Sequence, residues 1–186
     1  MKKEDYNIFV TPIRVIDLDK KQQKEIQEYY SNVWDNILEV PNVKVKTTWG
    51  QEQPKPFCPL LENIIAENLE GFIERITNLI PTAVIGDHWL QEYNYGAAHM
   101  PHHHPGSIVS GVYYIESNNL GSPLVFYNPN NAQHFMNYAT YSSMVECWQG
   151  RLVLFPSWLL HGVPECRNQE TIRRVIAFNI DEDKHV

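Results

Sequence analysis

The chain has 186 residues, of which 43% are hydrophobic and 20% are charged, so it can build a sizeable core and is not a disordered protein. Its formal net charge of −7 argues against a nucleic-acid-binding protein, because phosphate recognition needs a basic surface. The three cysteines lack a CxxC spacing, which argues against a zinc ribbon or disulfide framework and fits a reducing, cytoplasmic compartment. No apolar run is long enough for a membrane span, and no secretory signal is visible.

The first 81 residues are expected to supply one strand and two helices. Residues 6–18 are typical of a short strand, residues 19–40 of a helix, and residues 42–56 of an extended loop. Residues 58–80 give the strongest helical pattern in the chain. Its apolar stripe consists of Leu61, Ile64, Ile65, Leu69, Phe72, Ile73 and Ile76.

From residue 83 onward the pattern changes to short apolar runs separated by turn residues. Helices first and short strands later predict a mostly β protein with N-terminal helices. We expect a single domain over residues 1–186, in which residues 82–181 form a double-stranded β-helix (jelly roll) and residues 1–81 supply an N-terminal strand and cladding helices. The predicted strands cover residues 83–93, 107–116, 122–128, 151–160 and 173–180.

Residues 100–116, MPHHHPGSIVSGVYYIE, place three consecutive histidines ahead of a predicted strand. Side chains on one face of a strand are two residues apart, so His102 and His104 would converge while His103 points away. His161 follows the apolar run GRLVLFPSWLL and would complete a three-histidine metal site. The alternatives are a solvated turn for the pair and a satisfied core position for His161.

The last predicted strand, TIRRVIAFNI, alternates between two kinds of side chain. An inward-facing Arg173 would need an anionic partner such as the carboxylate of a co-substrate, because a buried unpaired charge is costly. The alternative is a surface arginine pair at the edge of a sheet. One face holds Arg173, Val175, Ala177 and Asn179, and the opposite face, bulky enough to pack against helices, holds Arg174, Ile176 and Phe178.

Together these motifs resemble the Fe(II)/2-oxoglutarate dioxygenase superfamily, on its prolyl-hydroxylase-like side. The resemblance covers roughly residues 85–180 and includes YNYGAAHMPHHHP, SGVYY, LFPSW with a following histidine, and RRVIAFN, a combination similar to a branch found among phages and marine bacteria. It implies an oxidoreductase that uses Fe(II), 2-oxoglutarate and O2. The metal ligands it implies are His102, His104 and His161, and the 2-oxoglutarate contacts are Arg173, Tyr114 and Tyr93.

One position departs from the superfamily, which usually has a carboxylate where this chain has His104. The sequence also resembles the cupins, whose first motif fits Gly96, His102 and His104 and whose second fits Gly150, Pro156 and His161. The cupin glutamate is missing, since Ile108 and Val109 stand at its place. We therefore expect a 2-oxoglutarate-dependent oxygenase. The alternatives are a cupin-type three-histidine enzyme (a dioxygenase without 2-oxoglutarate, or a zinc isomerase or hydrolase) and a binding protein that keeps only the fold.

Other residues receive smaller roles. His99 is expected to support the site or the structure, and His134 is assigned nothing. Phe155, Trp148 and Trp158 are expected in the core. Residues 128–147 form a long loop, either a lid over the substrate or a plain connection. The substrate is expected to be a small molecule or a peptide, and jelly-roll enzymes often pair, which makes a homodimer an expectation.

Overall fold

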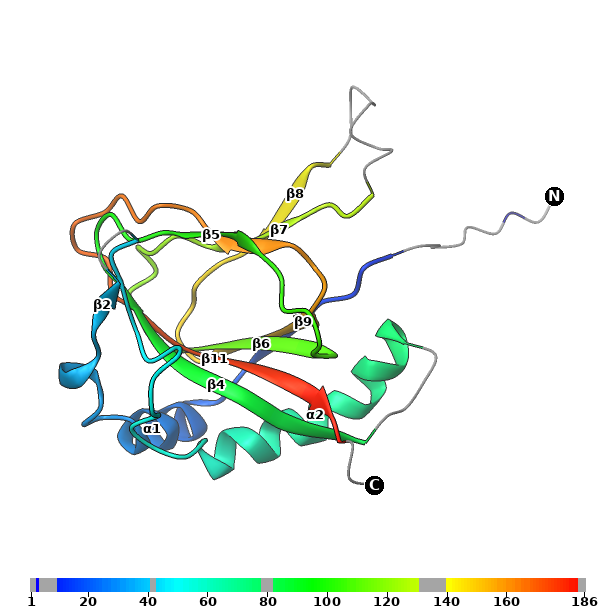
Figure 1. Ribbon diagram of the computed structural model, residues 1–186, viewed down its shortest axis with the longest axis horizontal. Coiled ribbons are helices and arrows are strands. Elements are labelled where there is room, and N and C mark those ends of the chain that lie inside the picture. The colour runs from blue at the N-terminus through cyan, green and yellow to red at the C-terminus, as the bar shows by residue number, and fades with distance from the viewer. Residues whose placement is uncertain (1–2, 4–9, 41–42, 78–81, 131–139, 184–186) are drawn as a thin grey trace.

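The computed structural model describes residues 3, 10–40, 43–77, 82–130 and 140–183. Two antiparallel sheets face each other, and two helices cover the outer face of the larger sheet (Figure 1). This arrangement confirms the predicted mostly β jelly roll with helical cladding. The helices are α1 (Lys20–Tyr29), α2 (Pro59–Ile76) and a short 3-10 turn (Trp34–Asn36).

The larger sheet has the strand order β1-β9-β6-β11-β4-β3-β2, and the smaller sheet has the order β5-β10-β7-β8. Strand β11 therefore lies in the middle of the larger sheet, which removes the sheet-edge alternative for its arginine pair. The strands are β1 (Arg14–Asp17), β2 (Glu39–Val40), β3 (Val45–Thr47), β4 (Ala83–Tyr93), β5 (His99–His102), β6 (Val109–Ser117), β7 (Leu124–Tyr127), β8 (Ser142–Val145), β9 (Arg151–Pro156), β10 (His161–Val163) and β11 (Arg173–Glu182).

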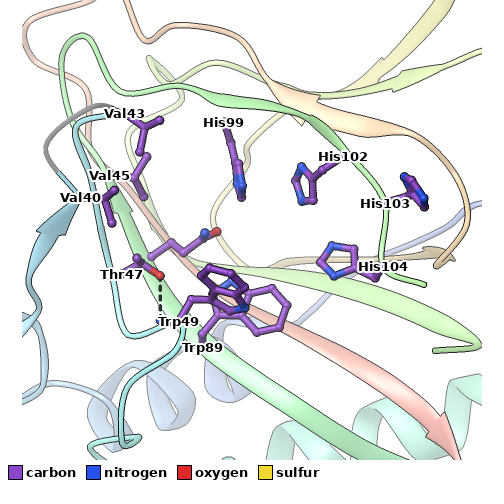
Figure 2. A pocket seen from close by; sticks show the side chains of 11 residues that line it. Val40, Val43, Val45, Thr47, Trp49, Trp89, His99, His102, His103 and His104 are labelled. Atoms are coloured by element: carbon purple, nitrogen blue, oxygen red, sulfur yellow. Dashed lines mark hydrogen bonds between the residues drawn. The ribbon is translucent and has the colours of Figure 1, made fainter. Parts of the chain in front are cut away.

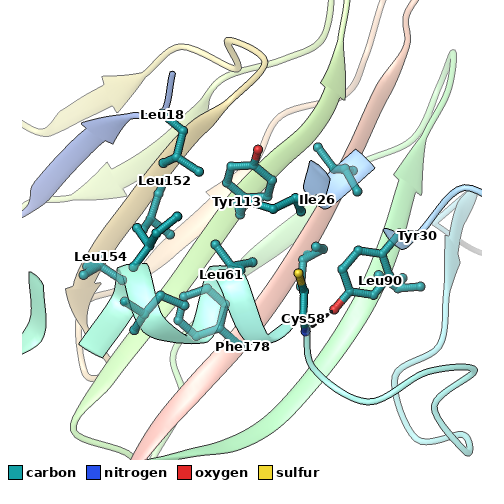
Figure 3. Packing of buried hydrophobic residues seen from close by; sticks show 14 of the residues in the cluster. Leu18, Ile26, Tyr30, Cys58, Leu61, Leu90, Tyr113, Leu152, Leu154 and Phe178 are labelled. Carbon is teal, nitrogen blue, oxygen red and sulfur yellow. Dashed lines mark hydrogen bonds between the residues drawn. The ribbon is translucent and has the colours of Figure 1, made fainter. Parts of the chain in front are cut away.

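Alternation along the central strands builds two separate cores, one under the helices and one between the sheets. On β11, Ile176 and Phe178 pack toward the helices, while Val175 and Ala177 face the smaller sheet, as predicted. Figure 3 shows the helix-side core, where Leu61 of α2 lies among side chains of the larger sheet that include Phe178. Every residue of the predicted α2 stripe except Ile76 is buried. The cladding helices therefore leave the inner face of the larger sheet free to line a site.

Helix α1 is shorter than predicted. Its first turn begins with a capping box, in which Asp19 accepts hydrogen bonds from the helix amides and Gln22 accepts one in return. It ends at Tyr29, and the Ser31 hydroxyl donates a hydrogen bond to the Glu28 carbonyl in its last turn, 3.0 Å away. The stripe residues beyond it, Val33 and Ile37, are still buried, so the helical spacing predicted which of these side chains are buried but not the backbone conformation.

Three further expectations were wrong. Residues 45–47, predicted as loop, form β3, and residues 142–145 of the predicted long loop form β8, which pairs with β7. Trp148 and Trp158, expected in the core, are 51% and 50% exposed, whereas Phe155 is buried as expected. The exposed Trp148 ring instead lies against the Arg151 guanidinium, 4.3 Å from its centroid.

Residues 131–139, which include His134, lie outside the described residues. The lid expected within residues 128–147 therefore stays a prediction. Among the described residues, no helix combines the length and the apolar character that crossing a membrane would need.

Candidate metal and co-substrate site

The pairing of β5 with β10 brings the distant histidines together. His102 ends β5, His161 begins β10, and the two residues are direct partners in the antiparallel ladder. His104 lies just beyond β5, where its amide donates to the Ser157 carbonyl, 2.9 Å away. The candidate ligand atoms of His102, His104 and His161 all lie within 4.8 Å of one another. The sequence pattern predicted that His102 and His104 lie on the same strand, but β5 ends at His102.

His103 separates from its two neighbours. It is exposed, while His102 and His104 are half-buried, and Figure 2 shows it away from the other rings. The prediction that His103 points away from the cluster agrees with this placement.

Two of the three imidazoles are held in the tautomer that a metal needs. The Nδ1 atoms of His102 and His161 each lie 2.8 Å from a backbone carbonyl, that of Met100 and that of Leu159. A carbonyl only accepts, so each Nδ1 carries the proton and each Nε2 keeps its lone pair. A hydrogen bond of this kind from the other ring nitrogen is the usual support of a metal-binding histidine. The donor set therefore fits a transition-metal ion.

Aromatic packing keeps these imidazoles neutral. The His104 ring stacks with Trp89 at 5.7 Å between centroids, and the Phe155 ring meets His161 edge-on at 4.6 Å. Burial lowers the pKa of His104 to about 4 and the pKa of His161 to about 3, each with help from the neighbouring histidines. Neutral rings at physiological pH are the form that binds metal.

Arg173 is a buried cation with no acidic side chain paired to it in the described part of the chain. It is 1% exposed, and its Nε and Nη1 atoms have no hydrogen-bond partner among the described residues. Its guanidinium lies over the Tyr93 ring, 4.2 Å from the centroid, and 5.1 Å from the centroid of Tyr114. The Tyr114 hydroxyl is also buried without a partner. Unsatisfied donors of this kind mark a place where an acceptor group belongs.

The neighbouring Arg174 has a different environment. It faces the helix side, where it binds Glu92 at 2.7 Å and Glu116 at 2.8 Å. Only Arg173 therefore remains available to an anionic ligand in this part of β11.

His99 contacts both the histidine cluster and Tyr93. Its ring stacks on His102 at 4.1 Å, and its Nδ1 atom lies 3.2 Å from the Tyr93 hydroxyl. The Tyr93 hydroxyl also donates a hydrogen bond to the Gln91 side-chain oxygen, 3.0 Å away. Burial raises the pKa of Tyr93 to about 12, with Arg173 acting in the opposite direction. The expected supporting position of His99 agrees with these contacts.

Two pockets connect these groups. An outer pocket of about 450 Å³ opens beside His102 and His104, and a narrow inner pocket of about 30 Å³ reaches past His161 to Arg173. Among the described residues that line either pocket, none is an aspartate or a glutamate. Both pockets share the side chains of Trp89, Gln91, His99, His102 and His104.

Trp89 and Gln91 were missed by the sequence reasoning. They precede Tyr93 on β4 at two-residue spacing, and all three line the inner pocket. This alternation was the signal that could have found them, because Tyr93 had already been assigned to the site.

Two glycines shape this part of the fold. Gly96, three residues after Tyr93, has a φ of +79° in the turn that leaves β4, a conformation that other residues rarely adopt. Gly162 on β10 lies so close to β5 that an added Cβ would be 2.9 Å from the His99 carbonyl oxygen. The pairing that joins His102 to His161 therefore requires glycine at position 162.

Comparison with known families gives a match. A family model described as "Putative 2OG-Fe(II) oxygenase" matches residues 87–179, a range that contains the three histidines and Arg173. No curated protein matches the chain by sequence.

Solved structures share the fold at low identity. HygX from Streptomyces hygroscopicus, with nickel and 2-oxoglutarate bound, has a TM-score of 0.63 at 12% identity and covers 94% of this chain and 84% of its own. A prolyl hydroxylase from Trichoplax adhaerens, in complex with a hypoxia inducible factor peptide, has a TM-score of 0.59 at 16% identity and covers 91% and 83%. The α-ketoglutarate-dependent epimerase SnoN has a TM-score of 0.62 at 10% identity, with 92% and 77% covered.

The substitution Gly162→Ala tests the strand approach. We expect it to destabilise the protein by about 1–3 kcal/mol through overpacking and to weaken Ni(II) binding about tenfold or more, because His102 must move from His161. Denaturant unfolding and metal titration measure the two effects. Gly71→Ala is the control, since nothing lies within 4 Å of its added Cβ and the helix should gain about 0.5–1 kcal/mol. Unchanged Ni(II) affinity in Gly162→Ala would contradict the argument.

The lowered histidine pKa values predict a pH dependence of the metal-free protein. In the unfolded chain, histidine side chains bind protons near pH 6.5. In the folded protein, the pKa of His104 is about 4 and the pKa of His161 is about 3, so both rings stay neutral at lower pH. The stabilising effect of neutral imidazoles is therefore present above about pH 6.5 and is lost as the pH falls toward 4. Tm measured across this range should fall, and His161→Gln should make the fall shallower. The same substitution at exposed His103 serves as the control; an equal slope in His161→Gln and wild type would refute the prediction.

Proposed function

Because the chain belongs to the 2OG-Fe(II) oxygenase family, we propose that it oxidises an organic substrate at the histidine cluster, with 2-oxoglutarate anchored by Arg173. Members of this family use Fe(II), 2-oxoglutarate and O2. The proposed metal ligands are His102, His104 and His161. The family match also favours this function over the cupin alternative.

The observation that carries the proposal is the Arg173 guanidinium, whose buried Nε and Nη1 atoms have no hydrogen-bond partner among the described residues. A buried arginine without a counter-ion is expensive, and a carboxylate that pairs with it in a dry pocket recovers that cost. Arg173 and the three histidines all line the inner pocket. A ligand with an anionic group at one end and metal-binding oxygens at the other suits this pocket. 2-Oxoglutarate is such a ligand, and the Tyr114 hydroxyl is a further donor for its far carboxylate.

When bound by the histidines, the metal ion with 2-oxoglutarate and O2 supplies the oxidising chemistry, in which the co-substrate is converted to succinate and CO2. The chain's own part is binding and positioning. The carbonyls of Met100 and Leu159 fix the ring orientation of His102 and His161. Trp89 and Phe155 keep water from two of the imidazoles. Arg173 sets the orientation of bound 2-oxoglutarate by pairing with its far carboxylate.

The third ligand separates this chain from the usual pattern. A two-histidine, one-carboxylate triad is the common iron site of non-heme oxygenases. Here His104 stands at the carboxylate position, and no described acidic side chain lines either pocket. We propose that the site functions with three neutral ligands and relies on the co-substrate for negative charge.

The proposed substrate is a small molecule or a peptide. HygX has been solved with hygromycin B bound, and the Trichoplax enzyme with a peptide fragment, so this fold accommodates both classes in other proteins. The acidic net charge of this chain disfavours nucleic acid.

The substitution Arg173→Gln tests the co-substrate anchor. Anaerobic Fe(II) and 2-oxoglutarate should give wild type a visible charge-transfer band. The variant should bind Fe(II) normally but need at least about thirtyfold more 2-oxoglutarate for the band, because a buried charge pair has been broken. Arg174→Gln, the neighbour that pairs with Glu92 and Glu116, should keep the wild-type requirement. An equal 2-oxoglutarate requirement in Arg173→Gln and wild type would refute the anchor; Fe(II) binding without any band in wild type would support the cupin alternative.

The pair His104→Ala and His104→Asp tests the third ligand. Removing the imidazole should abolish Fe(II) binding, whereas aspartate should preserve it, because a carboxylate oxygen is the common third ligand. Equilibrium dialysis with iron analysis measures both. If His104→Ala retains wild-type iron content, His104 is not a ligand.

A further inference from the structure

The outer pocket has a wall unlike the metal site beside it. Figure 2 shows valines on the side of the pocket opposite His99 and His102, with two tryptophans below. None of the described lining residues is an aspartate, glutamate, lysine or arginine. The apolar wall consists of Val40, Val43, Val45, Trp49 and Trp89.

The charged neighbours of this wall are turned away from it. On β3, Val45 and Thr47 line the pocket, while Lys46 between them binds Glu92 at 2.7 Å. The Thr47 hydroxyl oxygen accepts a hydrogen bond from the Trp49 amide at 3.1 Å (Figure 2). The Gln91 oxygen lies 3.0 Å from the Tyr93 hydroxyl. The Thr47 and Gln91 oxygens therefore already have hydrogen-bond partners within the protein, and the other polar side chains of the pocket are the histidines on its opposite side.

Part of the wall is left uncovered. Trp49 is 68% exposed and Val40 is 40% exposed, although both line the pocket. Large apolar side chains that remain open beside a binding site indicate a surface that a ligand covers. Trp89 by contrast is buried and stacks on His104, so it joins this surface directly to a proposed metal ligand.

Except for Trp89, the wall comes from outside the family match. Val40, Val45 and Trp49 precede residue 87, where the match begins, and β3 reaches the site by pairing with β4 at the edge of the larger sheet. The segment is therefore suited to set which substrate this chain accepts, while the matched strands carry the common chemistry.

We propose that the substrate is an uncharged, mainly apolar small molecule that packs against Trp49, Trp89 and the valines, with its reacting carbon beside His102 and His104. This inference rests on the proposed function and names its substrate class. A charged group placed on this wall would lose hydration without gaining a partner, which is costly. The pocket volume of about 450 Å³ lies within the range of small-molecule sites, roughly 300–1,000 Å³.

Three probes with one ring system and different charge test the proposal: 2-naphthylmethanol, 2-naphthoate and 2-naphthylmethylammonium. Binding is measured by saturation-transfer NMR on the full, metal-free chain, so that the carboxylate cannot coordinate a metal. The neutral probe should bind at least about tenfold more tightly than either ion, a conservative figure for an unpaired buried charge. Trp49→Ala should weaken its binding without unfolding the protein, because that side chain is mostly exposed.

Charge substitutions at the half-exposed Val40 make the test specific. Val40→Asp should shift the preference toward the ammonium probe, and Val40→Lys toward the carboxylate. Val15→Asp, on the edge strand β1 and 42% exposed, should leave the preference unchanged. Equal binding of all three probes by wild type would overturn the proposal, as would a Val40 series that behaves like Val15→Asp.

The two proposals fail separately. The charge-transfer band with Fe(II) and 2-oxoglutarate, measured without a probe, reports on the proposed function alone. Absence of that band overturns the proposed function, while a retained preference for the neutral probe still supports the ligand class of the pocket.

Discussion

The approach of β5 to β10 is the constraint on which the candidate site depends. His102 and His161 are far apart in the sequence and become direct ladder partners only through this pairing. The absence of a side chain at Gly162 permits it, because a Cβ there would meet the β5 backbone. Backbone carbonyls next to the paired strands then orient both rings. The same pairing that joins β5 to β10 in the smaller sheet therefore brings two of the three candidate ligands together.

The electrostatics of the site follow from the lack of acidic side chains among the described residues that line it. Three neutral imidazoles and a buried arginine face a space in which no described lining residue is acidic. A divalent cation bound there would add positive charge to that of Arg173, so the pocket is suited to a dianion in its inner part. The opposite wall of the outer pocket, made of valines and tryptophans, has no charged side chain among its described residues. The molecule thus separates an ionic inner region from an apolar outer one.

Sequence patterns predicted the parts of this arrangement that depend on local alternation. The two faces of β11, the stripe of α2 and the inward direction of Arg173 all follow from two-residue or helical spacing, and the structure agrees. The histidine cluster was also anticipated, although β5 ends at His102 and His104 is placed by a hydrogen bond to the distant Ser157 carbonyl. Such a tertiary contact leaves no local signal. The strand at residues 45–47 was missed for the same reason, since a three-residue strand is defined by its partner β4.

The position of β2 and β3 has an evolutionary consequence. These strands sit at one margin of the larger sheet, and β2 has a ladder partner on one side only. Sequence changes there leave the hydrogen bonding between β4, β11 and β6 intact, so the cost to folding is small. New selectivity can therefore arise by sequence changes in this peripheral hairpin while the strands that carry the proposed metal ligands stay unchanged. Divergence among relatives should concentrate where Val40, Val45 and Trp49 stand.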